Sequence, residues 1–280
     1  MAEKITIKSL DIDLQYAVER ITNFIKEYLA KSKAKGYVIG LSGGIDSSTT
    51  LALLVKAVGS EKITGLIMPF KGITPEEDIN DALDLANSFN VKHHIICINS
   101  IFEAFKSIIP YFDEQDRISN GNLMARTRMI LLYYYANKYN YLVAGTGDKS
   151  EILLGYFTKG GDGMVDILPI GDLYKTQVRK VAKYLGLPER IVTKPSSPRL
   201  WAGQIAEQEL GISYETIDLV LYSLFDLRLS MDEIAEKTGI SKSVIQAIYE
   251  RVISSQHKRN LPPIPRISAR TTGLDLRMPI

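Results

Sequence analysis

The stretch Tyr37-Val38-Ile39-Gly40-Leu41-Ser42-Gly43-Gly44-Ile45-Asp46-Ser47-Ser48 passes from an apolar run through a glycine-rich turn, and residues 49–54 continue it with a helical pattern. The apolar run predicts a buried strand over 37–41, and the residues after the turn predict a helix over 46–58. Gly43 and Gly44 can adopt backbone conformations that other residues avoid, so that an anion can approach successive main-chain N–H groups. The dipole of the following helix strengthens this attraction. The stretch therefore predicts a phosphate-binding loop at the end of a strand.

Polar side chains at both ends of this loop extend the prediction. Ser42 and Ser47 supply hydroxyl groups, and Asp46 can hold a magnesium ion that offsets phosphate charge. No lysine stands where the Walker A pattern requires Gly-Lys-Ser/Thr, which disfavours γ-phosphoryl transfer of the P-loop kind. An ordinary tight turn is the alternative, but the full pattern between a strand and a helix favours an anion site. We expect ATP to contact the loop and its flanks, which are Gly40, Leu41, Ser42, Gly43, Gly44, Ile45, Asp46 and Ser47.

Strand and helix patterns alternate on both sides of the loop. Further strands are predicted at 63–68, 92–98 and 141–144, and further helices at 13–33, 75–89 and 122–138, with Thr74 capping the helix that starts at Pro75. This alternation predicts an α/β fold with a doubly wound, mostly parallel sheet. Gly145-Thr146-Gly147 follows the last of these strands. We therefore expect two loops to meet at the sheet edge where such folds bind ligands.

The second half of the chain is predominantly helical. Helices are predicted at 173–185, 214–225, 231–238 and 241–257, and the glycine-rich segment 158–171 is interpreted as a long mobile loop that serves as a lid. We expect a single domain over 1–264, with a core of about 36–190 and additional C-terminal helices over about 200–260. Prolines after Pro262 predict an extended surface tail over 265–280.

Composition limits the classes of function. The 280 residues carry 34 Lys and Arg against 32 Asp and Glu, a net charge of +2 that gives no general attraction to nucleic acid or anionic membrane. We expect a cytoplasmic protein, because no apolar run could span a bilayer and the N-terminus lacks the pattern of a signal peptide. The single cysteine, Cys97, lies in the apolar run 95–98 and is predicted to be a buried structural thiol.

The loop 42–47 resembles that of the ATP-pyrophosphatase superfamily, whose members hold the pyrophosphate that leaves when a substrate attacks the α-phosphate of ATP. Other stretches resemble the NAD synthetase family, in an order that extends from the N-terminal helix to about Ile264. The most specific of them are 125–129, 155–163, 209–214 and 257–259. The resemblance implies an adenine nucleotide alpha hydrolase-like fold and a carbon–nitrogen ligase that adenylates the nicotinate carboxylate of deamido-NAD and lets ammonia displace AMP.

The resemblance also implies roles for individual residues. Deamido-NAD would contact Arg126, Lys159, Asp166, His257 and Lys258. ATP would contact Thr146, Lys175 and Ser197, magnesium would bind Asp46 and Glu151, and Asp46 and Lys175 would be catalytic. The alternative for each is ordinary surface polarity. Two departures from relatives stand at Ile205-Ala206, where many carry Thr-Asp, and at 147–150, where this chain looks closer to an archaeal-like version.

The remaining expectations concern partners and rivals. The resemblance implies a homodimer. One core-like cysteine allows no Cys-His amidase pattern, so we expect free ammonia as nitrogen donor, with neither nucleic acid nor membrane as a partner. One rival is another ATP-pyrophosphatase, either tRNA-modifying or amide-forming. A second is a DNA-binding protein, because residues 231–245 have the spacing of a helix-turn-helix, although near-neutral charge disfavours it.

Overall fold

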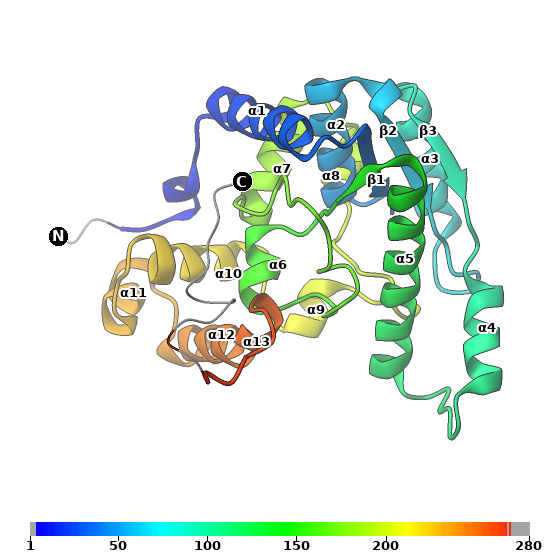
Figure 1. The fold of residues 1–280 in the computed structure, drawn as a ribbon. Coiled ribbons are helices and arrows are strands. Elements are labelled where there is room, and N and C mark those ends of the chain that lie inside the picture. The colour runs from blue at the N-terminus through cyan, green and yellow to red at the C-terminus, as the bar shows by residue number, and fades with distance from the viewer. Residues whose placement is uncertain (1–3, 268, 270–280) are drawn as a thin grey trace.

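A parallel β-sheet forms the centre of the computed structural model, which describes residues 4–267 and 269 (Figure 1). Its strands are β1 Gly36–Gly40, β2 Ile63–Ile67, β3 Lys92–Ile95 and β4 Tyr141–Ala144, in the spatial order β3-β2-β1-β4. In the register, Tyr37 of β1 pairs with Ile63 on one side and with Leu142 on the other. The order reverses between β1 and β4, where a crevice opens beyond the carboxyl ends of the strands. The predicted fold class is confirmed.

Helices cover both faces of the sheet. One face carries α1 Leu14–Ser32, α2 Ile45–Val58, α3 Glu76–Ser88, α7 Lys175–Tyr184 and α8 Glu189–Val192, which share the larger apolar core with the sheet. The other carries α4 Asn99–Ile108 and α5 Arg117–Tyr139, which pack against Val38, Leu66 and Val143. The short helix η2 Ser60–Lys62 leads from α2 into β2, whereas η1 Ile7–Leu10 buries Leu10 in the second apolar cluster, described next. The central strands β1 and β2 are thus buried on both faces, as their apolar sequences require.

The additional C-terminal helices form a second apolar cluster beside the sheet (Figure 1). They are α9 Ala206–Leu210, α10 Tyr214–Leu221, the π-helix η3 Tyr222–Asp226, α11 Met231–Thr238, α12 Lys242–Ser254 and α13 Gln256–Arg259. Helix α6 Lys149–Leu154, which follows β4, buries Leu154 in the same cluster. The helix-turn-helix-like pair is α11 and α12, and it buries Ile234 and Ile248 in this cluster. Packing of a short helical pair therefore accounts for the spacing observed in the sequence.

Two local predictions are wrong: the helix cap at Thr74 and the burial of Cys97. Thr74 does not cap α3, because its Oγ1 accepts a hydrogen bond from Phe70 N at 3.0 Å and Pro75 takes the N-cap position. Cys97 is exposed rather than buried, and its Sγ lies 3.0 Å from Asn99 Oδ1. The cause is that β3 is an edge strand ending at Ile95, so alternate residues of the run beyond it face solvent.

The segment 158–171 is also better packed than the sequence suggests. It contains no helix or strand, yet Ile167 and Ile170 are buried in the larger core. Gly145 N donates to Ile167 O at 2.8 Å, so that residue 167 lies alongside β4 as a short continuation of the sheet. The prediction of an unpacked loop is therefore wrong for its second half.

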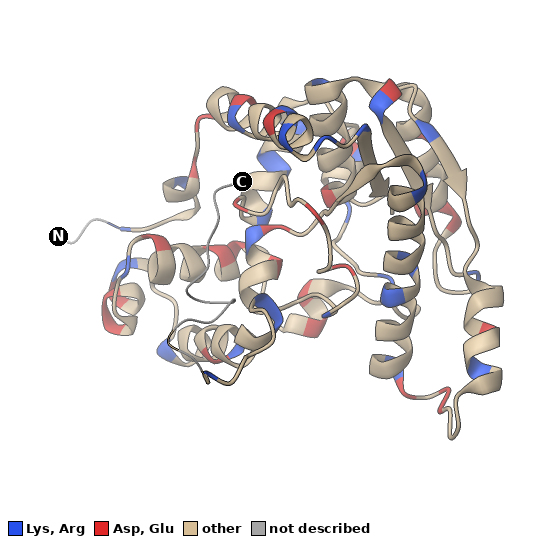
Figure 2. Ribbon diagram, in the orientation of Figure 1, with Lys and Arg blue, Asp and Glu red and all other residues tan. Residues whose placement is uncertain are grey.

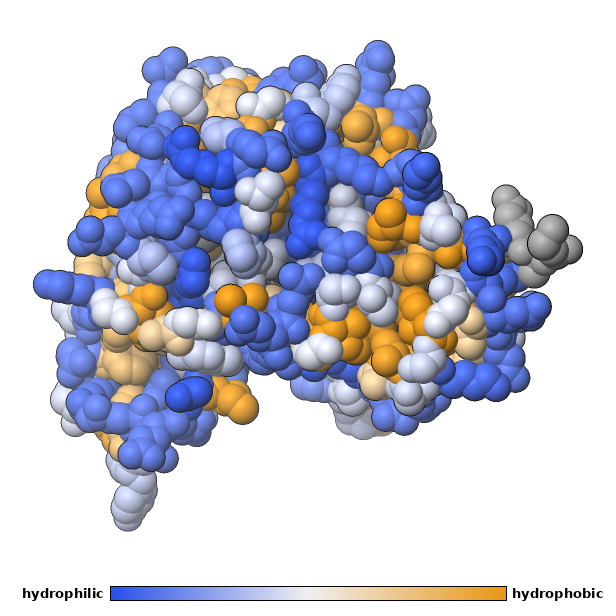
Figure 3. Space-filling view, turned by 180° about the vertical axis from the view of Figure 1, so that it is seen from behind, coloured by the Kyte–Doolittle hydropathy of each residue, from blue (hydrophilic) through white to orange (hydrophobic). Residues whose placement is uncertain are grey.

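Charged residues of both signs are interspersed over the helices (Figure 2). On the face shown in Figure 3, hydrophilic surface surrounds separate apolar patches. Among the described helices, none is long and apolar enough to cross a bilayer. The predicted tail 265–280 lies largely outside the described residues.

Candidate active site

The loop between β1 and α2 has the geometry of an anion site. Ser42 Oγ and Ser47 Oγ lie 3.0 Å apart, and Gly44 N donates to Ser42 Oγ at 3.3 Å. Gly43 has a φ of +73°, and a Cβ at this position would lie 2.1 Å from Asp78 O of α3. Both the backbone angle and the close approach therefore require glycine at this position. The hydroxyl groups close the loop and hold its main chain at the start of α2.

A cavity of about 430 Å³ opens beside this loop, at the crevice between β1 and β4. Nine of the predicted site residues line it: Gly40, Leu41, Ser42, Asp46, Ser47, Thr146, Glu151, Ser197 and Lys258. They come from the end of β1, from the loops that follow β1 and β4, from α6, from the segment before α9 and from α13. The structure therefore brings together most of the predicted ATP site and part of the predicted dinucleotide site.

Lys175 lies at the start of α7 with its side chain 0% exposed. Its Nζ contacts three carboxylates: Asp46 at 2.7 Å, Asp148 at 2.9 Å and Glu151 at 2.9 Å. Asp148 also accepts a hydrogen bond from Glu151 N at 2.8 Å and so caps α6. Lys175 does not line the cavity, and its predicted contact with ATP remains a prediction. One ammonium group among three carboxylates leaves this cluster with an excess of negative charge.

The pKa values of the cluster reflect this crowding. Burial raises the pKa of Asp148 to about 6, because Lys175 offsets the desolvation only partly and Asp46 adds to it. Burial likewise raises the pKa of Glu151, with Asp148 and Asp46 adding to the effect and Lys175 opposing it. For Lys175, burial lowers the pKa, but the three carboxylates outweigh it and raise the pKa well above its usual value. The lysine is therefore firmly protonated.

The carboxylates suit a magnesium ion. Asp46 Oδ1 is buried and has no hydrogen-bond partner, while Asp46 Oδ2 is held by Lys175. Glu151 lines the same cavity. Magnesium typically takes one or two protein carboxylates together with substrate phosphates and water. Within the described part of the chain, no group of three or more His, Cys, Asp or Glu side chains is arranged to hold a metal ion by itself.

A buried carboxylate from the C-terminal helices supports this cluster. Asp218 of α10 is fully buried and accepts hydrogen bonds from Ser150 Oγ at 2.5 Å and from Thr176 N at 2.8 Å. Ser150 Oγ in turn accepts from Lys175 N at 3.0 Å. Asp218 thereby fixes the first turn of α7 against α6, and with it both Lys175 and Glu151.

The predicted dinucleotide contacts are only partly assembled. Lys258 Nζ reaches the segment after α6, donating to Gly155 O at 2.7 Å, whereas His257 is exposed and does not line the cavity. Arg126 and Lys159 are also exposed and outside the cavity, joined by a hydrogen bond from Arg126 Nη2 to Lys159 O at 3.2 Å.

Asp166 holds the sheet edge, because its Oδ2 accepts from Val143 N at 2.7 Å. Its position gives it a structural bond in addition to any contact with a ligand.

Sequence reasoning passed over several residues that the fold brings to the site. Arg128 lines the cavity and donates from Nε to Met68 O at 3.1 Å; burial lowers its pKa to about 10. It belongs to the quoted motif 125–129, which gave no reason to choose it over Arg126. The sequence could have identified Asp148 as the cap of a helix, because an aspartate three residues before a glutamate is the pattern of a capping box. Asp218 had no such pattern.

A glycine-rich loop at the end of β1 without a Walker lysine, facing carboxylates that follow β4, places the chain among nucleotide-binding α/β proteins of the ATP-pyrophosphatase kind. Comparison with known proteins narrows this class. A family model described as NAD synthase matches residues 17–262. The chain belongs to the NAD synthase family.

Individual relatives agree with this placement. An NH(3)-dependent NAD(+) synthetase of Staphylothermus marinus is 54% identical over 264 residues, covering 94% of this chain and 96% of the relative. The structure of an NMN synthetase from Francisella tularensis matches with a TM-score of 0.80 at 35% identity, and the match covers 92% of this chain and 100% of the synthetase chain. The structure of an NH3-dependent NAD synthetase from Campylobacter jejuni matches with a TM-score of 0.76 at 34% identity, and the match covers 91% of this chain and 100% of that chain.

Proposed function

We propose that this chain is an ammonia-dependent NAD synthetase, which uses ATP to adenylate the nicotinate carboxylate of deamido-NAD and then forms the amide of NAD. The observation that carries the proposal is one cavity lined by the loop residues Ser42 and Ser47, the carboxylates of Asp46 and Glu151, and Lys258. The high identity to an NH(3)-dependent NAD(+) synthetase over nearly the whole chain supports the same reaction.

Adenylation is needed because a free carboxylate does not react with ammonia to form an amide. Its oxygen is a poor leaving group and its charge repels nucleophiles. In the first step a carboxylate oxygen attacks the α-phosphorus of ATP, and the bond to the β-phosphate oxygen breaks to release pyrophosphate. Ammonia then attacks the acyl carbon, AMP leaves with the former carboxylate oxygen, and one proton is lost to solvent. AMP is a good leaving group, so the second step is easy.

The chain's own residues would position and neutralise the reactants. The loop amides at Gly43 and Gly44 and the hydroxyls of Ser42 and Ser47 would bind the departing pyrophosphate. Asp46 and Glu151 would hold magnesium, which supplies positive charge to the phosphate oxygens. We propose that Lys258 contacts deamido-NAD from α13, together with Arg126, Lys159, Asp166 and His257. Catalysis then rests on orientation and electrostatics rather than on a covalent intermediate with the protein.

A direct assay tests this function. The protein is incubated with ATP, magnesium, deamido-NAD and ammonium, and NAD, AMP and pyrophosphate are quantified. We expect the three products in equal amounts, and glutamine in place of ammonium should give little NAD. Robust activity with glutamine and none with ammonium would contradict the nitrogen donor, and ADP with phosphate as products would contradict adenylation.

A second candidate is amidation of nicotinate mononucleotide, which carries the same carboxylate without the adenosine half. The likeness to the NMN synthetase structure favours it, although the identity is lower at 35%. Comparing kcat/KM for the two substrates in the same assay separates these functions. We expect deamido-NAD to be preferred, and a preference for the mononucleotide would reassign the product.

We also propose a homodimer. Helix α5 exposes Ile118, Ile130 and Tyr134, with 71%, 54% and 60% of each residue accessible, which are large apolar side chains for a free surface. Light scattering coupled to size-exclusion chromatography should give twice the mass of the chain. A monomer at micromolar concentration would contradict this assembly.

A further inference from the structure

The proposed chemistry requires positive charge beside the loop 42–47, and the structure shows a shortage of it there. Pyrophosphate departs with several negative charges. Lys175 cannot meet them in the observed arrangement, because its ammonium is fully buried among three carboxylates. Lys258 is engaged by two main-chain carbonyls, those of Gly155 and Phe157. A further protein cation beside the loop would therefore add to the charge of the magnesium ion proposed above.

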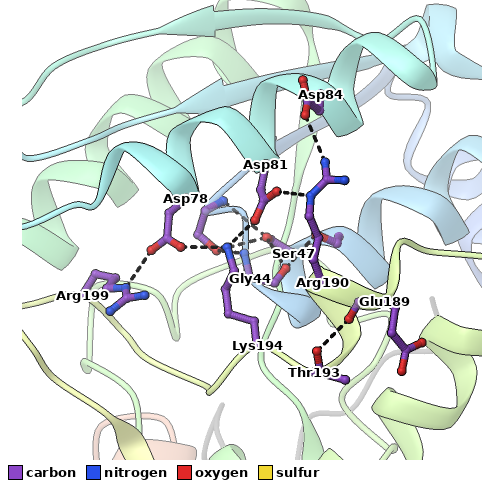
Figure 4. A network of polar contacts seen from close by, with 12 residues as sticks. Gly44, Ser47, Asp78, Asp81, Asp84, Glu189, Arg190, Thr193, Lys194 and Arg199 are labelled. Atoms are coloured by element: carbon purple, nitrogen blue, oxygen red, sulfur yellow. Dashed lines mark hydrogen bonds and ion pairs between the residues drawn. The ribbon is translucent and has the colours of Figure 1, made fainter.

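Arg199 lines the cavity and is tied to the loop through one residue. Its Nε donates to Asp78 Oδ2 at 2.7 Å. The main chain of Asp78 lies against the loop, since its carbonyl oxygen would be 2.1 Å from a Cβ placed on Gly43. Figure 4 shows this ion network in the same region as Gly44 and Ser47. Asp78 thus holds a guanidinium next to the anion-binding loop.

The network leaves most of this guanidinium available. Lys194 Nζ contacts Asp78 Oδ1 at 2.8 Å and also contacts Asp81, which Arg190 holds from its other side at 2.6 Å. Lys194 therefore offsets the charge of Asp78 without Arg199. In the described part of the chain, the Arg199 guanidinium makes hydrogen bonds through Nε alone. Its two Nη groups keep their donors for a ligand.

The backbone at Arg199 is also unusual. Its φ is +50°, in the left-handed region that non-glycine residues seldom occupy, and Arg199 N donates to Ser197 Oγ at 3.2 Å. Such a conformation costs free energy and persists where surrounding contacts impose it, commonly at functional sites. Here it joins Arg199 to Ser197, a predicted ATP contact, in one tight turn.

We propose that Arg199 binds the β- and γ-phosphates of ATP and the pyrophosphate that they become, and that Asp78 orients its guanidinium. A planar pair of Nη donors matches two phosphate oxygens, a geometry that lysine cannot reproduce. Arg199 thereby supplies, from the segment before α9, the positive charge that the loop lacks in place of a Walker lysine. The inference rests on the proposed function only in requiring ATP to break at its α-phosphorus.

Binding of the two product halves tests the inference separately. Inorganic pyrophosphate and AMP are each titrated calorimetrically, with magnesium present, into the wild-type protein and into Arg199→Gln and Arg199→Lys. Arg190→Gln is the matched control, because Arg190 belongs to the same network but does not line the cavity. Thermal unfolding of each variant verifies its fold, and Arg199→Lys retains the charge should Arg199→Gln fold poorly.

We expect Arg199→Gln to weaken pyrophosphate binding by about tenfold or more and Arg199→Lys by less, with AMP binding unchanged. Arg190→Gln should leave both affinities unchanged. Unaltered pyrophosphate binding in Arg199→Gln would overturn the inference. Equal losses for pyrophosphate and AMP would also overturn it, since they would indicate a role in holding the segment rather than the phosphates. If the wild type makes no NAD yet Arg199→Gln selectively loses pyrophosphate, the proposed function fails and the inference stands.

Discussion

Replacement of Asp218 by asparagine tests whether the C-terminal helices position the cluster of Lys175 and its three carboxylates. The carboxylate is fully buried and accepts from two donors, Ser150 Oγ at 2.5 Å and Thr176 N at 2.8 Å. Asparagine offers one acceptor oxygen and one amide nitrogen, so it can satisfy only one of the two. The other donor then meets an N–H group, and the first turn of α7, which carries Lys175, must shift.

The magnitude follows from these bonds. A hydrogen bond to a buried charged group contributes about 1.5–3 kcal/mol, and losing one should lower the free energy of unfolding by about 2 kcal/mol. Part of this loss is offset, because burial raises the pKa of Asp218 and its ionised form is costly to bury. If Lys175 and Glu151 have the proposed roles, their displacement should lower kcat/KM for ATP by about tenfold to a hundredfold, since misplacing groups that position the reactants by about 1 Å has effects of this size.

The assay compares urea unfolding with steady-state kinetics at a temperature well below unfolding. Glu207→Ala is the matched control: it removes Oε1, which accepts from Tyr214 N at 2.7 Å in the same helical region, and Glu207 has no bond to α7. This variant should lose stability and keep kcat/KM for ATP. Ser150→Ala should not add to the kinetic loss of Asp218→Asn, because both act through the same turn. A folded Asp218→Asn variant with unchanged kcat/KM would refute the positioning role.

Three further substitutions probe the loop and its neighbours. Gly43→Ala should abolish ATP binding measured by calorimetry, because its Cβ would meet Asp78 O. Gly160→Ala is the control: Gly160 has a similar φ of +70°, and a Cβ there would meet nothing within 4 Å, so this variant should lose only about 1–2 kcal/mol of unfolding free energy through backbone strain. Lys175→Met should lower the free energy of unfolding by about 3–5 kcal/mol in urea, because it leaves buried carboxylates without a cation; a stabilised variant would contradict the cluster. Burial of Asp81 is outweighed by its cationic partners, so its pKa is lowered. Its contribution to stability is present above pH of about 4 and lost as pH falls through the folded-state pKa, so the stability difference between wild type and Asp81→Asn should shrink below pH 4, and a constant difference would count against the ion pairs.

The sequence predicts what depends on near neighbours along the chain. The strand expected at 37–41 is β1 Gly36–Gly40, and the helix expected at 46–58 is α2 Ile45–Val58. Periodicity of apolar residues and the conformational freedom of glycine act over a few positions, so they are legible without a structure. The same local logic placed the loops after β1 and β4 at one edge of the sheet.

Contacts between distant residues escaped this reasoning. Lys175 and Asp46 are 129 positions apart, and no sequence pattern in either segment predicts that the Lys175 ammonium is buried among carboxylates. Asp218 and Asp78 look like ordinary acidic residues of amphipathic helices until the fold is known. A charge that interacts across the fold leaves no periodic signal in the sequence.

Burial of Cys97 was mispredicted for a related reason. An apolar run reads alike in a central strand and at a sheet edge, and only the strand order reveals that β3 has no neighbour on one side among the described residues. The segment 158–171 shows the converse. The glycines of its first half suggest an unpacked loop, but its second half buries Ile167 and Ile170, and Ile167 forms a sheet contact with Ala144 that the sequence does not display.

The central claim is that the loop 42–47 holds ATP while it breaks at the α-phosphorus to activate a carboxylate. The most direct measurement uses deamido-NAD with heavy oxygen in its nicotinate carboxylate, together with ATP, magnesium and ammonium, and mass spectrometry of the products. We predict that each AMP formed carries one heavy oxygen and that pyrophosphate carries none. Heavy oxygen in phosphate or pyrophosphate, with unlabelled AMP or ADP, would contradict the account.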